Sequence, residues 1–495
     1  MDKIFKNLRW VGALILLTLV LAACTQAAPE TVEVEVTRVQ TEQVEVPIEV
    51  TRIVEVEGET VVEVEEIVVT ATPEPAAEAP AEEGGGLKIG IVTFLSGGAA
   101  APFGVPARNG FEVLIQQINA GAAPAPYDMP GIGGVPIEAV FVDEAGGADT
   151  QVAELRRLIL DEKVDLVIGY ISSGDCSALA PVVEELQTLV VFFDCGTNAI
   201  FEEIVPEPHY LFRTSGHQIL DNVGAARYVA ENFPEVTSIS GINQDYAWGH
   251  DSWNTFSSSM QQLNPAIQVQ NELFPKIYAG EYSAEISELQ ATGSNLIHSS
   301  FWGGDLEAFV IQSTGVALET GSTLLLTTGD TMLPRLGRDV PPGIIVAARG
   351  PHGALAPDSA LNDWFVGIYS DRYSTRPVYS AYHAAQALLG VKAAYEKAIA
   401  DNGLAEGELP DVEQVIVAFE GLEFDTPSGL ISMALANGHQ AVEGTAYGVT
   451  GDFNPETDEV ELLNVVTYPP ACVNPPAGVT SPDWIASGFE GADCP

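Results

Sequence analysis

A net charge of −49 at pH 7 over 495 residues, from 69 acidic and 20 basic side chains, excludes the broad positive surface that nucleic acids and anionic lipid surfaces require. The chain is too long for one ordinary domain, so two or three domains are expected. One of the five cysteines lies near the N-terminus, and the even remainder is typical of disulfides in an exported protein.

The N-terminus has the pattern of an export signal. Three cations within the first nine residues precede an apolar run over residues 10–23, which is shorter than a typical membrane span. The run ends in Leu-Ala-Ala-Cys at residues 21–24, which resembles the bacterial lipobox. That resemblance implies a cleaved signal peptide, residues 1–23, and lipidation of Cys24, with two or more acyl chains holding the protein on a membrane. The alternative is an ordinary signal peptide with a cysteine near its cleavage site.

The segment that follows Cys24 is acidic and repetitive. Residues 30–83 contain sixteen Glu and two Arg, repeat the triplet Val-Glu-Val, and end in a stretch rich in Pro, Ala, Glu and Gly. Because turn-forming and aromatic residues are scarce here, self-repulsion is expected to keep the segment extended. Residues 24–86 are therefore predicted to be a tether, and the alternative is a β-stalk that pairs with itself or with a neighbour.

From residue 87 the chain alternates β-rich runs with segments of helical period. This spacing predicts a parallel sheet covered by helices on both faces. The predicted strands span residues 87–92, 135–143, 164–168 and 189–193, and the predicted helices span residues 107–118, 149–159 and 178–186.

The same alternation restarts after Arg213. Two similar arrays predict an α/β protein of two Rossmann-like parallel-sheet lobes joined by a crossover hinge. Lobe one is predicted to span 87–213 plus about 350–436, and lobe two 214–349 plus about 437–495. The second array has predicted strands at 238–242, 267–272, 296–300 and 324–327 and helices at 222–232, 252–263 and 283–290; helices at 362–369, 379–399 and 412–418 then return to lobe one, and strands within 438–466 complete lobe two.

Short motifs in a fixed order carry a family resemblance over residues 87 to about 466. Leu95-Ser96-Gly97 precedes Phe103-Gly104, Val167-Ile168-Gly169 precedes Ser172-Ser173-Gly174, and Phe301-Trp302-Gly303-Gly304 ends a later strand. In order and spacing the chain resembles the leucine/isoleucine/valine-binding family of type I periplasmic binding proteins. That resemblance implies a solute receptor of an ABC importer, with permease subunits as partners.

Candidate binding residues follow the predicted strands of lobe one. Ligands of parallel α/β sheets bind beyond the C-terminal strand ends, where helix N-termini offer N–H donors. Ser173 and Thr197 lie at such ends beside the amides of Gly174 and Gly196. The matching family positions bind the α-carboxylate of the ligand. The alternative is that both hydroxyls only cap the next helix.

Aromatic and acidic residues complete the predicted site. Phe103 and Trp248 are expected to close over the ligand, with core packing as the alternative, and Tyr246 and Trp302 permit a bulkier or flatter ligand. Asp305 or Asp330 is expected to neutralise a ligand ammonium, with a turn-forming role as the alternative. The predicted ligand is an amino acid, an amide or a related small polar solute.

The four later cysteines allow three disulfide pairings. Cys176–Cys195 and Cys472–Cys494 are favoured because each pair is local in the sequence. The first would staple the two donor loops together. Asp175 beside Ser173 would disfavour a ligand carboxylate if it pointed inward.

Catalytic motifs are absent from the sequence. No phosphate-binding loop, zinc-protease motif or nucleophile elbow occurs, and the seven His show no metal-ligand spacing. An enzyme, a cofactor and a metal are therefore not expected. Solute capture by hinge closure is the predicted mechanism. The alternative is a ligand-sensing surface lipoprotein that signals through a separate membrane partner.

Overall fold

A computed structural model describes residues 48–56, 59–67 and 85–495, in two units that divide after Glu83. The predicted signal peptide, Cys24 and much of the predicted tether lie outside these residues. In the first unit, β1 (Ile48–Val56) pairs with β2 (Glu59–Ile67) in an antiparallel sheet. Self-pairing, which was the alternative to an extended tether, therefore holds for these residues.

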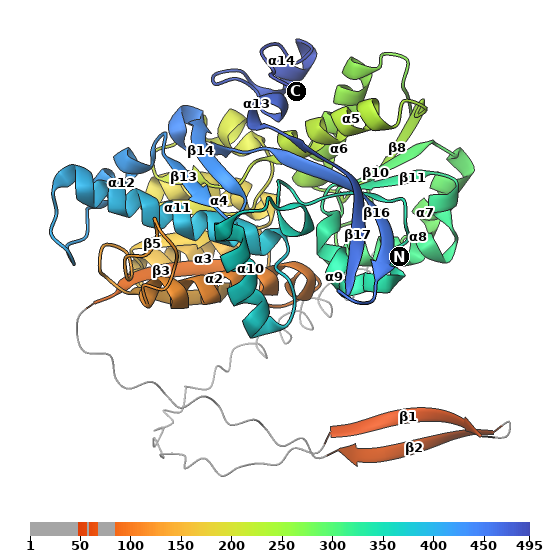
Figure 1. The fold of residues 1–495 in the computed structure, drawn as a ribbon, viewed down its shortest axis with the longest axis horizontal. Helices are drawn as coiled ribbons and strands as arrows, with labels where there is room; N and C mark the ends of the chain where they lie inside the picture. The colour runs from red at the N-terminus through yellow and green to blue at the C-terminus, as the bar shows by residue number, and fades with distance from the viewer. Residues whose placement is uncertain (1–47, 57–58, 68–84) are drawn as a thin grey trace, which may run out of the picture. The chain divides into compact units, whose positions relative to one another are not determined.

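The first lobe of the second unit is built on an eight-stranded sheet (Figure 1). Its strand order is β13-β14-β15-β7-β6-β5-β3-β4, and the strands from β15 to β4 run parallel while β13 and β14 form an antiparallel edge. The strands are β3 (Leu87–Thr93), β4 (Ile137–Asp143), β5 (Leu166–Gly169), β6 (Val190–Phe192), β7 (Leu211–Arg213), β13 (Glu423–Thr426), β14 (Gly429–Leu435) and β15 (Gln440–Val442).

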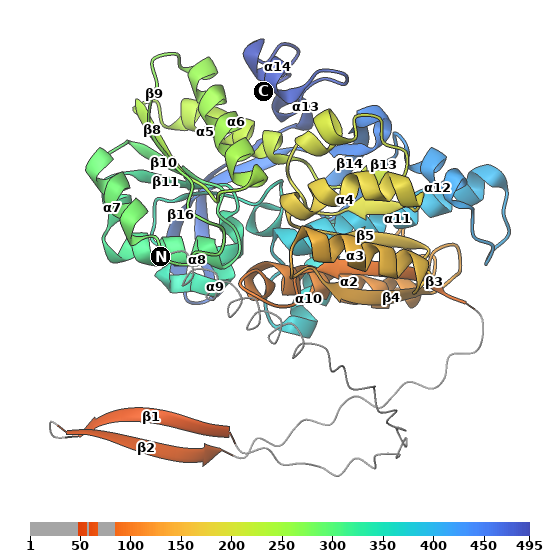
Figure 2. The same cartoon turned by 180° about the vertical axis from the view of Figure 1, so that it is seen from behind.

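Alternating side chains of this sheet bury two separate cores, as the period of a strand requires. Ile168 packs into a core with Phe111 and Leu388, whereas its neighbour Val167 packs with Leu158 and Leu179 on the opposite face. Figure 2 shows the second of these faces, covered by α3 and α4. The helices of this lobe are α2 (Val105–Asn119), α3 (Ala148–Leu160), α4 (Ser173–Leu186), α10 (Ala360–Tyr373), α11 (Tyr379–Asn402) and α12 (Val412–Phe419).

The second lobe contains a seven-stranded sheet in the order β17-β16-β12-β11-β10-β8-β9. Ile297 and Ile239 lie on neighbouring parallel strands yet face different cores, which again places a helical layer on each face. The strands are β8 (Ser238–Ile242), β9 (Gln268–Leu273), β10 (Leu296–Ser299), β11 (Thr323–Leu326), β12 (Ile345–Ala347), β16 (Thr445–Asn454) and β17 (Glu459–Tyr468). The helices are α5 (Gln218–Asn232), α6 (Ala247–Leu263), α7 (Ser283–Thr292), α8 (Gly304–Gly315), α9 (Leu333–Leu336), α13 (Pro470–Val473) and α14 (Ser481–Ala486).

Three crossovers join the lobes, and the predicted α/β fold of two parallel-sheet lobes is confirmed. They follow β7, β12 and β15 in the chain. The first sheet extends further than predicted, since Gln440 of β15 pairs with Arg213 of β7. The second sheet therefore resumes at β16 rather than near residue 437. The β13–β14 hairpin was not predicted from the sequence, because β13 has only four residues and three of them are polar.

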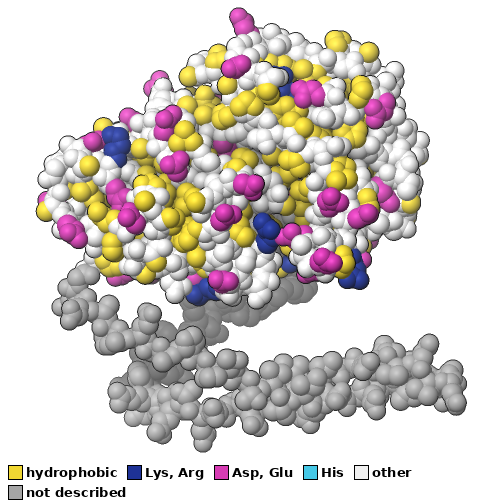
Figure 3. Space-filling model, in the orientation of Figure 1, with side chains coloured by type: hydrophobic (Ala, Val, Ile, Leu, Met, Phe, Trp, Pro, Cys, Tyr) yellow, Lys and Arg dark blue, Asp and Glu magenta, His cyan; other side chains and the backbone are white. Residues whose placement is uncertain are grey.

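The surface matches the composition. On the face in Figure 3, Asp and Glu side chains are widely spread, whereas Lys and Arg are few. Among the described residues, no helix combines the length and the apolar character needed to cross a bilayer.

Candidate functional site

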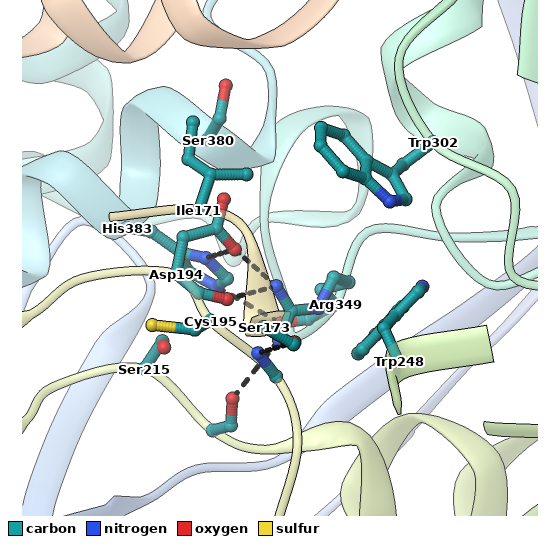
Figure 4. Close-up of polar contacts among 12 residues, drawn as sticks. Ile171, Ser173, Asp194, Cys195, Ser215, Trp248, Trp302, Arg349, Ser380 and His383 are labelled. Carbon is teal, nitrogen blue, oxygen red and sulfur yellow. Dashed lines mark hydrogen bonds and ion pairs between the residues drawn. The ribbon is translucent and has the colours of Figure 1, made fainter. Parts of the chain in front are cut away.

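A small cavity, with room for little more than one water molecule, lies between the lobes, at the C-terminal strand ends. Figure 4 shows Trp248 and Trp302 of lobe two facing Ile171 and Ser173 of lobe one, with Arg349 of the second crossover between them. Nine residues line the cavity: Phe103, Ile171, Ser173, Gly196, Tyr246, Trp248, Trp302, Arg349 and Tyr379.

The aromatic lining is held rigidly. Phe103 lies edge-on to both Trp302 and Tyr379, with ring centroids 5.4 Å and 4.7 Å apart. Trp302 Nε1 donates to Tyr246 Oη at 2.6 Å, which leaves the hydroxyl proton of Tyr246 for another acceptor. Trp248 Nε1 donates to a main-chain carbonyl at 2.8 Å. These contacts fix aromatic side chains from both lobes around one space.

Ser173, like Tyr246, lines the cavity with a hydroxyl that is free to donate. Its Oγ accepts the backbone N–H groups of Gly196 at 3.1 Å and Thr197 at 3.2 Å. Because both lone pairs are used, the hydroxyl proton remains for a ligand acceptor. The amide of Gly196, a predicted ligand donor, already bonds within the protein.

The loop before α4 offers few further N–H donors. Glu144 accepts from the amides of Ile171 at 2.8 Å and Ser172 at 2.7 Å, and burial raises its pKa well above the usual range. Burial also raises the pKa of Asp175 to about 6. The amides of Ile171 and Ser172 are therefore already used within the protein.

Arg349 supplies a guanidinium whose positive charge is already paired with carboxylates of the protein. It is stacked over Trp248, with Cζ 4.6 Å from the ring centroid. Its Nη1 forms an ion pair with Asp194, and its Nε lies 3.4 Å from Asp221. Burial raises the pKa of Asp221 to about 7. The residue presents a flat cationic face to the cavity without an unpaired positive charge.

The family model described as periplasmic binding protein matches residues 86–452. The chain belongs to the periplasmic binding protein family. Its predicted membership of the type I group is supported by solved structures with the same fold. A search of curated proteins finds no matching sequence.

Three solved structures illustrate the likeness. A solute-binding protein from Rhodopseudomonas palustris, in complex with 3,4-dihydroxybenzoic acid, has a TM-score of 0.65 at 19% identity and covers 78% of this chain and 97% of its own. An ABC transporter substrate-binding protein from Sphaerobacter thermophilus has a TM-score of 0.64 at 19% identity, covering 78% and 98%. A branched-chain amino acid binding protein from Streptococcus pneumoniae, in complex with isoleucine, has a TM-score of 0.63 at 16% identity, covering 77% and 100%.

In this periplasmic binding protein, five of the predicted site residues line the cavity. These are Phe103, Ser173, Gly196, Trp248 and Trp302, from three loops of lobe one and two of lobe two. Their convergence follows from topology, since the C-terminal ends of parallel strands meet at one edge of each sheet.

The other four predicted residues are not among the lining residues. Gly174 lies in the first turn of α4. Thr197 donates to Asp251 at 2.5 Å. Asp305 accepts from the side-chain amide of Gln244 and a backbone amide, both at 2.7 Å, and Asp330 accepts from the amide of Tyr379 at 2.9 Å. One oxygen of each of these three side chains thus bonds to the protein itself.

Sequence reasoning missed the contributions of Arg349, Tyr379 and Ile171. Arg349 and Tyr379 lie far along the chain from the strand-end loops, on the second crossover and at the start of α11. One signal was present: Arg349 directly follows the apolar residues 344–348, where a buried cation is unusual.

Both predicted disulfides, Cys176–Cys195 and Cys472–Cys494, are present. The first joins α4 to the loop after β6, which carry Ser173 and Gly196. This bond keeps the serine hydroxyl and the amides that orient it in one rigid unit.

Proposed function

We propose that this protein is the solute receptor of an ABC importer, capturing a small solute in the cavity when its lobes close. The observation that carries the proposal is the lining itself, drawn from both lobes and a crossover. A solute that contacts both lobes binds the closed state more tightly than the open one and shifts the population toward it. The permease subunits then recognise the closed state.

Contacts across the cleft support closure. Gly304 of lobe two donates its amide to the Gly98 carbonyl of lobe one at 3.1 Å. Trp302 of lobe two packs against Phe94 of lobe one, with ring centroids 5.9 Å apart. These contacts are small and confined to loop tips, so a rotation about the crossovers breaks them at low cost and admits solute.

The lining favours a flat aromatic solute over an aliphatic amino acid. Five of the nine lining side chains are aromatic, and none of the nine is a carboxylate that would pair with a ligand ammonium. Burying an unpaired ammonium is costly. Ser173 and Tyr246 offer hydroxyl protons to a phenol or a carboxylate of the solute. Similar structures hold 3,4-dihydroxybenzoic acid and 4-hydroxybenzoate, which agrees with this ligand class.

The N-terminal pattern supports an anchored receptor outside the cytoplasmic membrane. Acylation of Cys24 after signal cleavage would tether the binding lobes to the bilayer through the acidic segment. Mass spectrometry of the N-terminal peptide from membranes tests this, and a Cys24→Ala variant is expected to leave the membrane fraction. Unmodified Cys24 in membrane-extracted protein would contradict the anchor.

Isothermal titration calorimetry tests the receptor proposal. The panel is benzoate, 4-hydroxybenzoate and 3,4-dihydroxybenzoate against isoleucine and valine. We expect saturable binding of at least one aromatic compound and little binding of the amino acids. Binding of isoleucine alone would overturn the aromatic ligand class but keep solute capture. Binding of no compound in a wider panel of small solutes would overturn solute capture.

A further inference from the structure

Behind the cavity, two imidazoles and a carboxylate converge on the crossovers. His352 lies on the second crossover, Glu443 on the third, and His383 on α11 of lobe one. One donor atom from each lies within 4.8 Å of the other two, and all three side chains are buried. These three residues, with their partners Asp194, Asp221 and Arg349, are called the crossover cluster below.

The hydrogen bonds of His383 leave a bare nitrogen in the cluster. Its Nδ1 lies 2.9 Å from Asp194 Oδ1, and since a carboxylate only accepts, Nδ1 carries the proton. In the neutral ring Nε2 then has a lone pair, and it lies 3.3 Å from the carbonyl oxygen of Arg349. The Nε2 lone pair of His383 and the carbonyl oxygen of Arg349 therefore face each other, and both are acceptors. A cation placed between these two atoms would bind to both.

A second ring nitrogen of the cluster belongs to His352. Its Nδ1 bonds to Ser428 Oγ at 2.6 Å, and its Nε2 lies 3.3 Å from Glu443 Oε2 without forming a hydrogen bond in the described part of the chain. A Cβ at Gly350, where φ is +135°, would lie 2.2 Å from His352 Nε2, so only glycine leaves room for this nitrogen.

A carboxylate in the cluster faces the imidazoles rather than the guanidinium. Asp194 and Asp221 pair with Arg349, whereas Glu443 lies beside His352. A buried carboxylate is stabilised when a positive charge joins it. Glu443 is thus the carboxylate of the cluster placed to bind a cation.

We propose that His352 Nε2, His383 Nε2 and Glu443 Oε2 bind one divalent transition-metal ion, with the Arg349 carbonyl oxygen as a fourth donor. Two imidazoles and a carboxylate suit Zn²⁺ best, with bonds of about 2.0–2.2 Å. The separation of 3.3 Å between His352 Nε2 and Glu443 Oε2 is close to the edge of such a tetrahedron. The other donors reach it by small side-chain rotations.

Outer contacts that orient metal ligands are already in place. Asp194 holds the Nδ1–H of His383, and Gln386 Nε2 donates to Glu443 Oε2 at 2.8 Å. Carboxylates that hold ligand imidazoles in this way are the usual second layer of a zinc site. The search for metal-ligand spacing in the sequence missed these three ligands, because they lie far apart in the chain and on three different segments.

The bound ion would act on the crossovers. Glu443 Oε1 accepts the amide of Gly216 on the first crossover at 2.5 Å, while His352 belongs to the second. Through the metal ion, Glu443 and Gly216, all three crossovers would thus be linked to α11. We expect the ion to stiffen the region about which the lobes rotate, independently of the solute.

Metal analysis of the full chain tests the proposal. The protein is equilibrated with Zn²⁺, dialysed against metal-free buffer and analysed by mass spectrometry for zinc. We expect about one Zn²⁺ per chain. The variants His352→Gln and Glu443→Gln are expected to lose it. A His209→Gln/His250→Gln control, which removes two exposed histidines paired with Glu413 and Asp245, is expected to keep it.

A second measurement needs no variant. Co²⁺ added to the wild-type chain is expected to give the intense visible absorption of a four-coordinate site, which Zn²⁺ then abolishes, and Zn²⁺ but not Mg²⁺ is expected to raise the Tm by several degrees. Failure of the wild type to retain zinc, or retention of zinc at the wild-type level by folded His352→Gln and Glu443→Gln chains, would overturn the proposal.

Discussion

The cleft and the crossover cluster share Arg349 but are built from opposite kinds of side chain. In the cleft, aromatic rings from both lobes surround a small space, and few of the polar groups there remain free. In the crossover cluster, carboxylates and imidazoles are buried together. Apart from the shared Arg349, no side chain that lines the cleft is charged, whereas the cluster concentrates charged and titratable groups.

This difference indicates that the two regions have separate roles, one in solute binding and one in stability. The cleft contributes contacts that form only when both lobes meet, so its residues should govern solute affinity. The crossover cluster ties together segments that stay joined in any lobe orientation, so its residues should govern stability. Four substitutions test this division, from the largest expected effect to the smallest.

Replacing Arg349 by Met should have the largest effect, on stability. The change leaves Asp194 and Asp221 buried without their cation, which costs about 3–5 kcal/mol of unfolding free energy. Urea unfolding measures it. The control is Arg376→Met, which removes an exposed ion pair with Glu459 and should cost about 0–1 kcal/mol. Equal losses in the two variants would contradict a special role for the cluster.

Replacing Trp302 by Ala should act mainly on affinity. The indole packs against Phe103 and positions the hydroxyl of Tyr246, so its loss should cost about 2 kcal/mol of binding, or roughly 30-fold in Kd. Calorimetry with the tightest aromatic ligand measures this. Trp364→Ala on α10, away from the cavity, is the control, and a similar loss of affinity there would mean that Trp302 acts only through folding.

Replacing Ser173 by Ala should lower affinity less. One hydrogen bond to the solute is lost, worth about 1 kcal/mol or roughly fivefold in Kd. Since the amides of Gly196 and Thr197 lose their acceptor, the Tm should fall as well. The control is Ser177→Ala, whose hydroxyl bonds only to the Ser173 carbonyl at 2.7 Å. Unchanged affinity in Ser173→Ala would remove the serine from the site.

Replacing Asp175 by Asn should change only the pH dependence of stability. Burial raises the pKa of Asp175 to about 6, so between about pH 4 and pH 6 the folded chain binds more protons than the unfolded one. Its contribution to stability is therefore lost as pH rises through this window and stays lost above it. The Tm of the wild type relative to Asp175→Asn should fall from pH 4 to pH 6 and then level. A constant difference would show that Asp175 titrates normally.

Much of the fold was predictable because strand and helix periods are local. The alternation around Ile168 and the helix period of α4 are written in neighbouring residues, and both disulfides join near neighbours in the sequence. Strand-end loops such as that of Ser173 were predictable for the same reason. Residues such as Arg349, His352 and Glu443 were not, because their partners come from crossovers and helices that meet only in the folded chain. For β1 and β2 the sequence pattern allowed a strand, but it could not say which segment that strand would pair with.

A crystal structure of the protein with the tightest aromatic ligand tests the central claim most directly. We predict that the ring lies in the cavity against Trp302 and Tyr379, with Ser173 Oγ donating to an oxygen of the ligand and both lobes in contact with it. The contrary result is a ligand bound elsewhere, for example in the larger pocket of about 260 Å³ lined by Arg213, His217 and Gln440. That result would show that this protein does not capture its solute between the lobes.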